Sequence, residues 1–305
     1  MNILEVKDVK KHLGKREIIK GITFNVKAGE IFGFLGPNGA GKTTTIRMLV
    51  GLIHPNSGTI AINGHDIEKE REKALEAVGA VVENPELYTY LSGRENLMQI
   101  ARIRKIEKDY VEKIIELVNL KERIDDKVKK YSLGMKQRLG LAAALIAKPK
   151  LLILDEPTNG LDPTGIMDFR DIVKKAARET GAAVFISSHI LSEVQMVCDT
   201  VAFINDGVIK SVESIRGEVV KDNTENIVLS VREKEECQEI LKKLEIVHDI
   251  SWESDMIKCT VDKDSVPEVI FKLAEAGIHI EEIYKKHAEL EERYMELVEG
   301  GKRSL

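Results

Sequence analysis

The first 220 residues alternate between short apolar runs and segments with helical periodicity. Four apolar runs have the length and composition of strands, and they cover residues 18–26, 31–35, 151–154 and 184–187. Turn signals and helical periods separate these runs. Because alternating strands and helices are typical of α/β domains, we predict an α/β fold with a mostly parallel sheet.

The alternation is interrupted between residues 93 and 147. Apolar side chains recur there at helical spacing, as Val111, Ile114, Ile115 and Val118 do, and no strand-like run intervenes. A stretch that is helical throughout, inside an α/β domain, predicts a helical subdomain inserted at about 93–147.

After residue 226 the pattern changes to shorter strands and helices. The chain reads as strand, helix, two strands, helix and strand, over residues 227–231, 233–244, 247–252, 256–261, 265–276 and 278–284. A final helix is predicted over residues 288–298, with an apolar stripe through Leu290, Tyr294, Leu297 and Val298. This order predicts a small α+β domain of the ferredoxin-like type.

Composition divides the chain at the same place. Nineteen of the 22 glycines lie before residue 220, whereas residues 221–305 hold 13 basic and 21 acidic residues, a net charge of −8. The polar, weakly patterned segment 213–226 is typical of a connector. We therefore predict a first domain at 1–212, a linker at 213–226 and an acidic accessory domain at 227–305.

Charge and hydropathy exclude several classes of protein. The net charge of −5 comes without a polybasic segment, so no nucleic-acid partner is expected. No apolar run approaches the roughly 18 residues that a membrane span needs, and the charged start does not resemble a secretory signal. Cys198, Cys237 and Cys259 lack the spacing of metal ligands, which favours buried thiols. We expect a cytoplasmic protein.

The strongest chemical signal follows the apolar run 31–35. The next residues fit the phosphate-binding P-loop and read Gly36, Pro37, Asn38, Gly39, Ala40, Gly41, Lys42 and Thr43, with Thr44 beginning a helical segment. In such a loop the backbone N–H groups and the lysine hold phosphates, while the threonine hydroxyl ligates Mg²⁺. The alternative is a glycine-rich turn, but the strand-loop-helix context favours phosphate binding.

Two further apolar runs end in polar groups. The run 151–154 is followed by Asp155 and Glu156, which could hold Mg²⁺ and activate a water molecule respectively. The run 183–186 leads to His189, which could donate a hydrogen bond to a phosphate oxygen. Each signal alone is compatible with a turn or a structural histidine. Beside a P-loop they indicate phosphate hydrolysis.

Ser132 precedes a helix whose apolar face continues to residue 146. Its hydroxyl is suited to cap that helix, and Gly134 follows in the first turn. The start of a capped helix can also bind an anion. Taken alone, the segment reads as an ordinary capped helix.

Together these segments resemble the ATP-binding cassette (ABC) ATPases, with a Walker A loop at 36–43, a signature at 131–138, a Walker B strand at 151–156, a D-loop at 159–163 and a switch histidine at 189. The resemblance covers residues 1 to about 212. It implies a P-loop NTPase fold with ATP and Mg²⁺ as ligands. It also implies a head-to-tail dimer, in which Ser132 and the Gly134 N–H contact the γ-phosphate held by the other subunit, with Asp162 at the subunit boundary.

Motifs at 91–97, 131–138 and 290–294 are similar to those of the ATPase subunits of bacterial drug, bacitracin and lantibiotic-immunity exporters. Three positions depart from the ABC pattern. The signature reads Tyr-Ser-Leu-Gly-Met at 131–135, and Leu13 stands where an aromatic residue often stacks on adenine. Glu83 replaces the Q-loop glutamine, and we expect its carboxylate to serve as a further Mg²⁺ ligand.

Three classes of function are compatible with these residues. The leading one is an ATPase subunit at the inner face of the cell membrane that powers a separate transmembrane permease, as an exporter, and docks it near residues 83–96. The alternative is a soluble ABC-type ATPase with a non-membrane partner, although the chain lacks the second cassette or long coiled coil of such proteins. Glu156 and His189 disfavour a regulatory module without hydrolysis.

Overall fold

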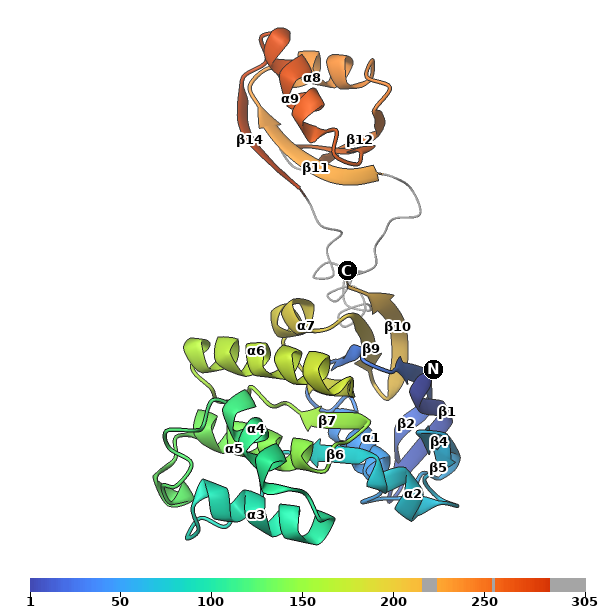
Figure 1. Ribbon diagram of the computed structural model, residues 1–305. Coiled ribbons are helices and arrows are strands. Elements are labelled where there is room, and N and C mark those ends of the chain that lie inside the picture. The colour runs from blue at the N-terminus through green and yellow to red at the C-terminus, as the bar shows by residue number, and fades with distance from the viewer. Residues whose placement is uncertain (216–223, 254–255, 286–305) are drawn as a thin grey trace. The chain divides into compact units, whose positions relative to one another are not determined.

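The computed structural model describes residues 1–215, 224–253 and 256–285, which belong to two compact units (Figure 1). The first unit spans Met1–Ile215, and the second lies within Arg216–Arg293. Strand β10 (Val208–Ser214) and strand β11 (Thr224–Val231) overlap the two ends of the linker predicted at 213–226, and the division into domains stays a prediction. The helix predicted at 288–298 lies outside the described residues.

A six-stranded sheet forms the centre of the first unit. Its order is β10-β9-β3-β8-β7-β6, in which the strands from β9 to β6 run parallel and β10 pairs antiparallel with β9. These strands are β3 (Ile31–Leu35), β6 (Val78–Val81), β7 (Leu151–Asp155), β8 (Ala183–Ser188) and β9 (Thr200–Asn205). Every residue of β3, β7 and β8 is buried, as expected for a parallel sheet covered on both faces.

A second, antiparallel sheet has the order β2-β1-β4-β5 and was not predicted. It consists of β1 (Asn2–Leu13), β2 (Arg16–Lys27), β4 (Ser57–Ile62) and β5 (His65–Asp66). The two sheets share a core in which Phe24 stacks on Phe32 and Phe185, with ring centroids 5.5 and 5.8 Å apart. Helix α1 (Lys42–Leu49) contributes Ile46, Met48 and Leu49 to the same core.

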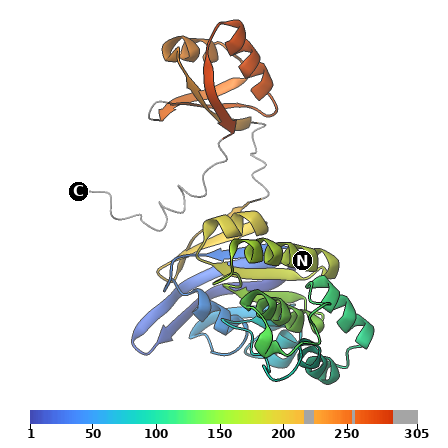
Figure 2. The same cartoon turned by 90° about the vertical axis from the view of Figure 1, so that its left-hand side faces the viewer.

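The helical insertion contains α3 (Gly93–Arg104), α4 (Lys108–Leu117), the 3₁₀ turn η1 (Val128–Lys130) and α5 (Leu133–Ile146). A capping box begins α3, because Ser92 Oγ accepts from the Glu95 N–H at 3.1 Å and the Glu95 carboxylate accepts from the Ser92 N–H at 2.7 Å. In the first unit, Figure 2 shows the blue antiparallel strands and the green inserted helices on opposite sides.

Three more helices complete the first unit: α2 (Arg71–Glu76), α6 (Pro163–Thr180) and α7 (Leu191–Val197). The Asp162 carboxylate caps α6 by accepting from the Gly165 N–H at 3.2 Å. The helix ends at Gly181, where φ is 67°. Helix α7 packs against β3 and β8, which brings its first turn near the end of β8.

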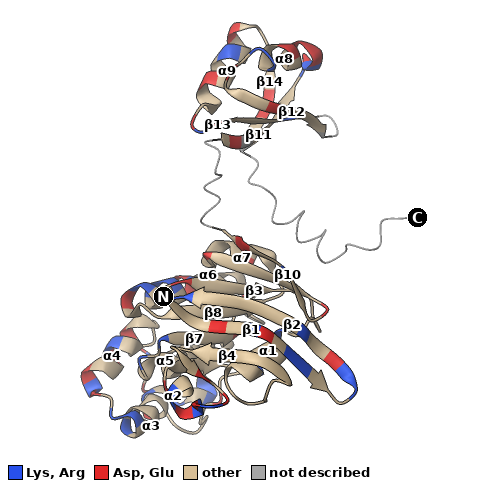
Figure 3. Cartoon of the chain, turned by 90° about the vertical axis from the view of Figure 1, so that its right-hand side faces the viewer, with Lys and Arg blue, Asp and Glu red and all other residues tan. Residues whose placement is uncertain are grey.

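The second unit has the ferredoxin-like arrangement. Its elements are β11, α8 (Lys234–Leu241), β12 (Val247–Glu253), β13 (Met256–Asp262), α9 (Val266–Glu275) and β14 (Ile280–Lys285), in the predicted order. The antiparallel sheet runs β12-β13-β11-β14 and packs on both helices around Leu229, Cys237 and Leu273. Glu235, Glu236 and Glu239 are exposed on α8. Figure 3 shows the acidic positions of this helix in red.

All three cysteines are buried, as the sequence predicts. Burial raises the pKa of the Cys237 thiol to about 11 and that of the Cys259 thiol to about 12. Because the thiolate is the reactive form, these two groups act as small apolar side chains of the second core.

The single tryptophan provides a test of the division into two units. Trp252 lies on β12, so its fluorescence reports the unfolding of the second unit. Leu273 is fully buried on α9, and we expect Leu273→Ala to lower the free energy of unfolding of this unit by about 2–5 kcal/mol. The measurement is urea unfolding followed by tryptophan fluorescence.

Leu145→Ala is the matched control, because Leu145 is equally buried but lies on α5 of the first unit. We expect this variant to leave the urea midpoint of the tryptophan signal unchanged. Equal shifts in both variants would show that the two units unfold as one cooperative body.

Candidate functional site

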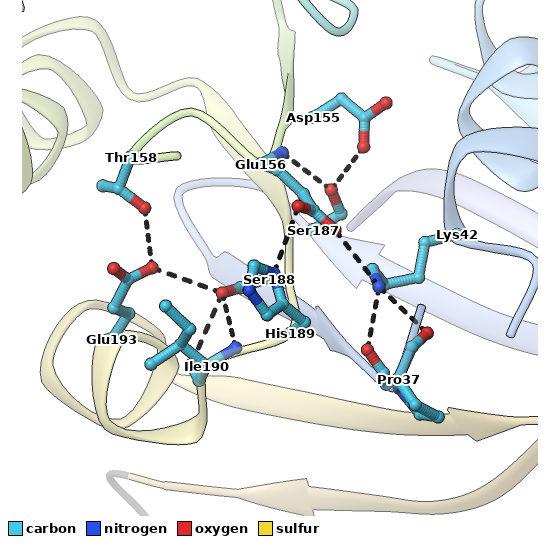
Figure 4. A network of polar contacts seen from close by, with 11 residues as sticks. Pro37, Lys42, Asp155, Glu156, Thr158, Ser187, Ser188, His189, Ile190 and Glu193 are labelled. Atoms are coloured by element: carbon cyan, nitrogen blue, oxygen red, sulfur yellow. Dashed lines mark hydrogen bonds and ion pairs between the residues drawn. The ribbon is translucent and has the colours of Figure 1, made fainter. Parts of the chain in front are cut away.

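The carboxyl ends of β3, β8 and β7 meet at one edge of the central sheet. Leu35 pairs with Ser188, and Asp155 pairs with Ser187, so the segments that follow the three strands leave the sheet side by side. Ligands of open parallel sheets bind at this edge. The register therefore brings the predicted P-loop, carboxylates and histidine together, and Figure 4 shows their contacts.

The P-loop connects β3 to α1 through a tightly packed turn. A Cβ atom at Gly36 would lie 2.1 Å from the carbonyl oxygen of Ile204, so only glycine fits there. Gly41 precedes α1 with a φ of 108°, a conformation that glycine adopts without strain. The remaining predicted loop residues occupy the same turn and the first turn of α1: Pro37, Asn38, Gly39, Ala40, Lys42, Thr43 and Thr44.

Lys42 is buried beneath the loop, with 4% of its surface exposed. Its Nζ donates to the carbonyl oxygens of Gly36 at 2.8 Å and Pro37 at 3.2 Å, and it lies 3.2 Å from Oε1 of Glu156. These three acceptors match the three N–H donors of the ammonium group. A phosphate oxygen that binds Lys42 must therefore replace one of them.

Glu156 lies between Lys42 and His189. Its Oε2 is 3.1 Å from Nδ1 of His189, and its backbone N–H donates to Ser187 Oγ at 2.9 Å. Its φ of 43° is unusual for glutamate and costs backbone energy. The surrounding contacts hold this conformation, and they place the carboxylate at the edge of the sheet between a cation and an imidazole.

Asp155 is almost completely buried, with 2% of its surface exposed. Burial is the main influence on its pKa and raises it, and the charges of Glu156 and Glu83 raise it further. Hydrogen bonds from Ser187, at 2.6 Å, and Thr43 act in the opposite direction and lower the pKa. A carboxylate surrounded by other carboxylates in this way gains from a bound cation.

A polar cavity of about 260 Å³ opens beside these groups. Its lining residues are Thr43, Glu83, Asn84, Gln137, Asp155, Glu156 and Asn159. Magnesium sites use one or two carboxylates together with hydroxyl, water and phosphate oxygens, and the hydroxyl of Thr43 beside Asp155 fits that set. Among the described residues, no group of three or more His, Cys, Asp or Glu side chains could hold a metal by itself.

Glu83 lies on the segment after β6 and lines the same cavity. Its Oε1 forms an ion pair with Nη2 of Arg47 at 2.5 Å, and both side chains are about half exposed. The Arg47 pair uses Oε1, so a metal would have to be ligated through Oε2 or in competition with Arg47. Its role as a metal ligand therefore stays a prediction.

Ser132 and Gly134 lie at the start of α5 and do not line the cavity. Ser132 Oγ caps the helix by accepting from the Met135 N–H at 3.3 Å, and its side chain is exposed. Gly134 is half-buried in the first turn. Within one chain, the structure does not bring these two residues to the P-loop lysine.

Four polar residues of the site were not predicted as site residues. Ser187 binds both Asp155 and the Glu156 N–H, and Asn84, Gln137 and Asn159 place amide groups in the cavity. Gln137 is only 3% exposed although it is polar. The sequence held only weak indications that these residues belong to the site. Asn84 directly follows Glu83, and Gln137 lies three residues after Gly134 on the same helix.

Comparisons with known proteins indicate the family of this chain. The family model described as ABC transporter matches residues 19–159. The uncharacterised ABC transporter ATP-binding protein YhcH of Bacillus subtilis is 45% identical over 97% of this chain and 95% of its own length. The bacitracin transport ATP-binding protein BcrA of Bacillus licheniformis is 39% identical, over 98% of both chains.

A solved structure leads to the same family. CbiO1 from Clostridium perfringens, part of the ABC transporter complex cbiONQ, superimposes with a TM-score of 0.66 at 27% identity, covering 80% of this chain and 96% of its own. In the described part of the chain, no helix is long and apolar enough to span a membrane. The resemblance to ABC ATPases found in the sequence is thus confirmed, and the chain belongs to the ABC transporter family as an ATP-binding subunit that hydrolyses ATP.

Proposed function

We propose that this chain powers a separate membrane permease, as an exporter, by hydrolysing ATP between two head-to-tail ATPase subunits. The observation that carries the proposal is the assembly of Lys42, Asp155, Glu156 and His189 at one sheet edge. Similarity to BcrA, whose name records bacitracin transport, supports a peptide antibiotic as the class of cargo. In such a complex the chain would sit on the inner face of the membrane.

Lys42 and Glu156 give the site a way to respond to ATP. Phosphate oxygens compete with the Glu156 carboxylate for the buried ammonium, because Lys42 has no donor to spare. Glu156, once released from Lys42, can accept a proton from the attacking water. His189 can donate a hydrogen bond to a phosphate oxygen. Thr43 and Asp155 would hold Mg²⁺, which would neutralise part of the phosphate charge.

The position of the signature, residues 131–138, supports the proposal of a second ATPase subunit. Ser132 is exposed at the N-terminal end of α5, where backbone N–H groups and the helix dipole favour an anion. The cavity of the same chain does not include Ser132 or Gly134. This position supports a head-to-tail arrangement, in which the γ-phosphate at this helix end would be held by the other subunit.

The docking site for the permease is proposed at the segment between β6 and α3. Tyr88 and Tyr90 are 55% and 66% exposed and meet edge to face at 6.0 Å. The buried Asn96 holds this segment rigid, because its side chain accepts from the Tyr88 N–H at 2.8 Å and donates to the Tyr88 carbonyl at 3.1 Å. Exposed aromatic side chains on a rigid backbone are typical anchors of protein interfaces.

The role of Glu156 can be tested directly. We expect Glu156→Gln to lower the rate of ATP hydrolysis by roughly 10²–10⁴-fold, since an amide cannot accept the proton of the attacking water. ATP affinity, measured by calorimetric titration, should be retained. Lys42→Ala is the comparison, because it should lose ATP affinity itself. Near-normal hydrolysis by Glu156→Gln would reject a role for Glu156 as the base.

The role of Glu83 requires a metal titration. If its carboxylate joins the Mg²⁺ shell, Glu83→Gln should raise the Mg²⁺ concentration needed for half-maximal ATP hydrolysis, because an amide supplies a dipole where a carboxylate supplies charge. Arg47→Gln is the control, since it removes the ion pair with Glu83 but leaves the carboxylate in place. An unchanged Mg²⁺ curve for Glu83→Gln would remove Glu83 from the metal site.

The permease proposal can be tested by purification from native membranes. We expect the tagged chain to bring with it an integral membrane protein that has several spanning helices. Replacing both Tyr88 and Tyr90 by alanine should weaken this association roughly tenfold or more, as the loss of interface anchors does.

Ile103→Ala is the control for the tyrosine variant, because Ile103 is 80% exposed on α3, outside the proposed docking segment. It should leave the association unchanged. Association with a soluble protein instead, insensitive to the tyrosines, would favour a soluble ABC-type ATPase.

A further inference from the structure

Glu193 connects the segment that carries Glu156 to the segment that carries His189 (Figure 4). It lies in the first turn of α7, and its Oε2 accepts from Thr158 Oγ1 at 2.6 Å and from Ser188 Oγ at 3.3 Å. Thr158 follows Glu156 by two residues, and Ser188 directly precedes His189. One carboxylate oxygen therefore binds both sides of the contact between the base and the histidine.

A second connection lies closer to the sheet. Ser187 Oγ donates to Asp155 at 2.6 Å and accepts from the Glu156 N–H at 2.9 Å. This connection fixes the backbone at Glu156 but does not reach the residues beyond it. Glu193 thus adds hydrogen bonds between the segment after Glu156 and the histidine segment to the side-chain contact between Glu156 and His189.

The surroundings of Glu193 strengthen its hydrogen bonds. A cavity of about 20 Å³ lies behind the contact, with an apolar lining that includes Phe169, Val173 and Ile186. This volume admits about one water molecule, so water competes weakly for the carboxylate. Glu193 is half-buried, and hydrogen bonds to a charged carboxylate are stronger than those between neutral groups.

Ser188 is itself oriented by the backbone. Its Oγ accepts from the Ile190 N–H at 3.0 Å, and its hydroxyl hydrogen can be donated to Glu193 at 3.3 Å or to the Ile190 carbonyl at 3.4 Å. Ser188 directly precedes His189, and Ile190 directly precedes α7. The hydrogen bond between Ser188 and Ile190 therefore links the His189 segment to the start of α7. Through Glu193, α7 thus contacts the segments that carry both Glu156 and His189.

We propose that Glu193 is a positioning residue for ATP hydrolysis, which sets the spacing of Glu156 and His189 without touching the nucleotide. The inference rests on the proposed roles of Glu156 and His189. Catalytic groups need alignment within a fraction of an ångström, whereas ATP binding depends on the P-loop, which contacts neither Thr158 nor Glu193 in the network described above. Loss of Glu193 should therefore lower kcat and leave KM unchanged.

The experiment compares three substitutions at the two ends of the contact. We expect Glu193→Ala and Thr158→Val each to lower kcat roughly 10–100-fold, as the loss of a hydrogen bond to a charged group does when it holds a catalytic group. Because Thr158→Val keeps the side-chain shape, it carries the test even if Glu193→Ala folds poorly. Thr158→Ser, which restores the hydroxyl, should recover most of the rate.

A double-mutant cycle separates positioning from a general structural effect. If both residues act through one contact, Glu193→Ala combined with Thr158→Val should be no slower than the slower single variant. The control is Ser192→Ala, since Ser192 is exposed on the same turn of α7. It should leave both kcat and KM unchanged.

Two outcomes would overturn the inference: multiplicative losses in the double variant, or a raised KM with unchanged kcat in the single variants. Failure of the underlying function is recognised separately, by normal hydrolysis in Glu156→Gln. If Glu156→Gln is impaired while Glu193→Ala and Thr158→Val are not, only the role of Glu193 is rejected.

Discussion

The site depends on the parallel register of three buried strands. β3, β8 and β7 are apolar at nearly every position and lie side by side, so their carboxyl ends are set by the packing of the core. Asp155 ends β7, Glu156 and His189 each come one residue beyond a strand, and Lys42 follows β3 through the P-loop. Hydrophobic burial, which has no chemical role in hydrolysis, therefore determines where the lysine, the carboxylates and the histidine meet.

Electrostatics then decides how the groups at this edge are arranged. Asp155, Glu156 and Glu83 bring three carboxylates to one cavity, and the buried Lys42 compensates only one of them directly. Burial is the main cause of the raised pKa of Asp155, and the charges of Glu156 and Glu83 add to it. Such a site favours a divalent cation, and it favours an anion only where Lys42 and the backbone N–H groups of the P-loop provide positive potential.

The proposed coupling between chemistry and partner also follows from the fold. The segment 83–96 borders the cavity through Glu83 and Asn84 and presents Tyr88 and Tyr90 to the outside. A permease bound at the tyrosines would therefore be within one short, rigid segment of the ATP site. Glu193 links α7 to the segment that carries Glu156. Both segment 83–96 and helix α7 therefore lie next to groups of the proposed catalytic site.

The α/β and ferredoxin-like folds, the P-loop, the two carboxylates and the histidine could be predicted from the sequence, because each lies in a contiguous strand-loop-helix segment with a strong local pattern. The packing of the folded chain was needed to show that Glu83 pairs with Arg47, that Gln137 lines the cavity, and that Thr158 binds Glu193, 35 residues away. It was also needed to show the antiparallel sheet of β1. These features depend on side chains from distant segments packing together, and no local periodicity encodes such contacts.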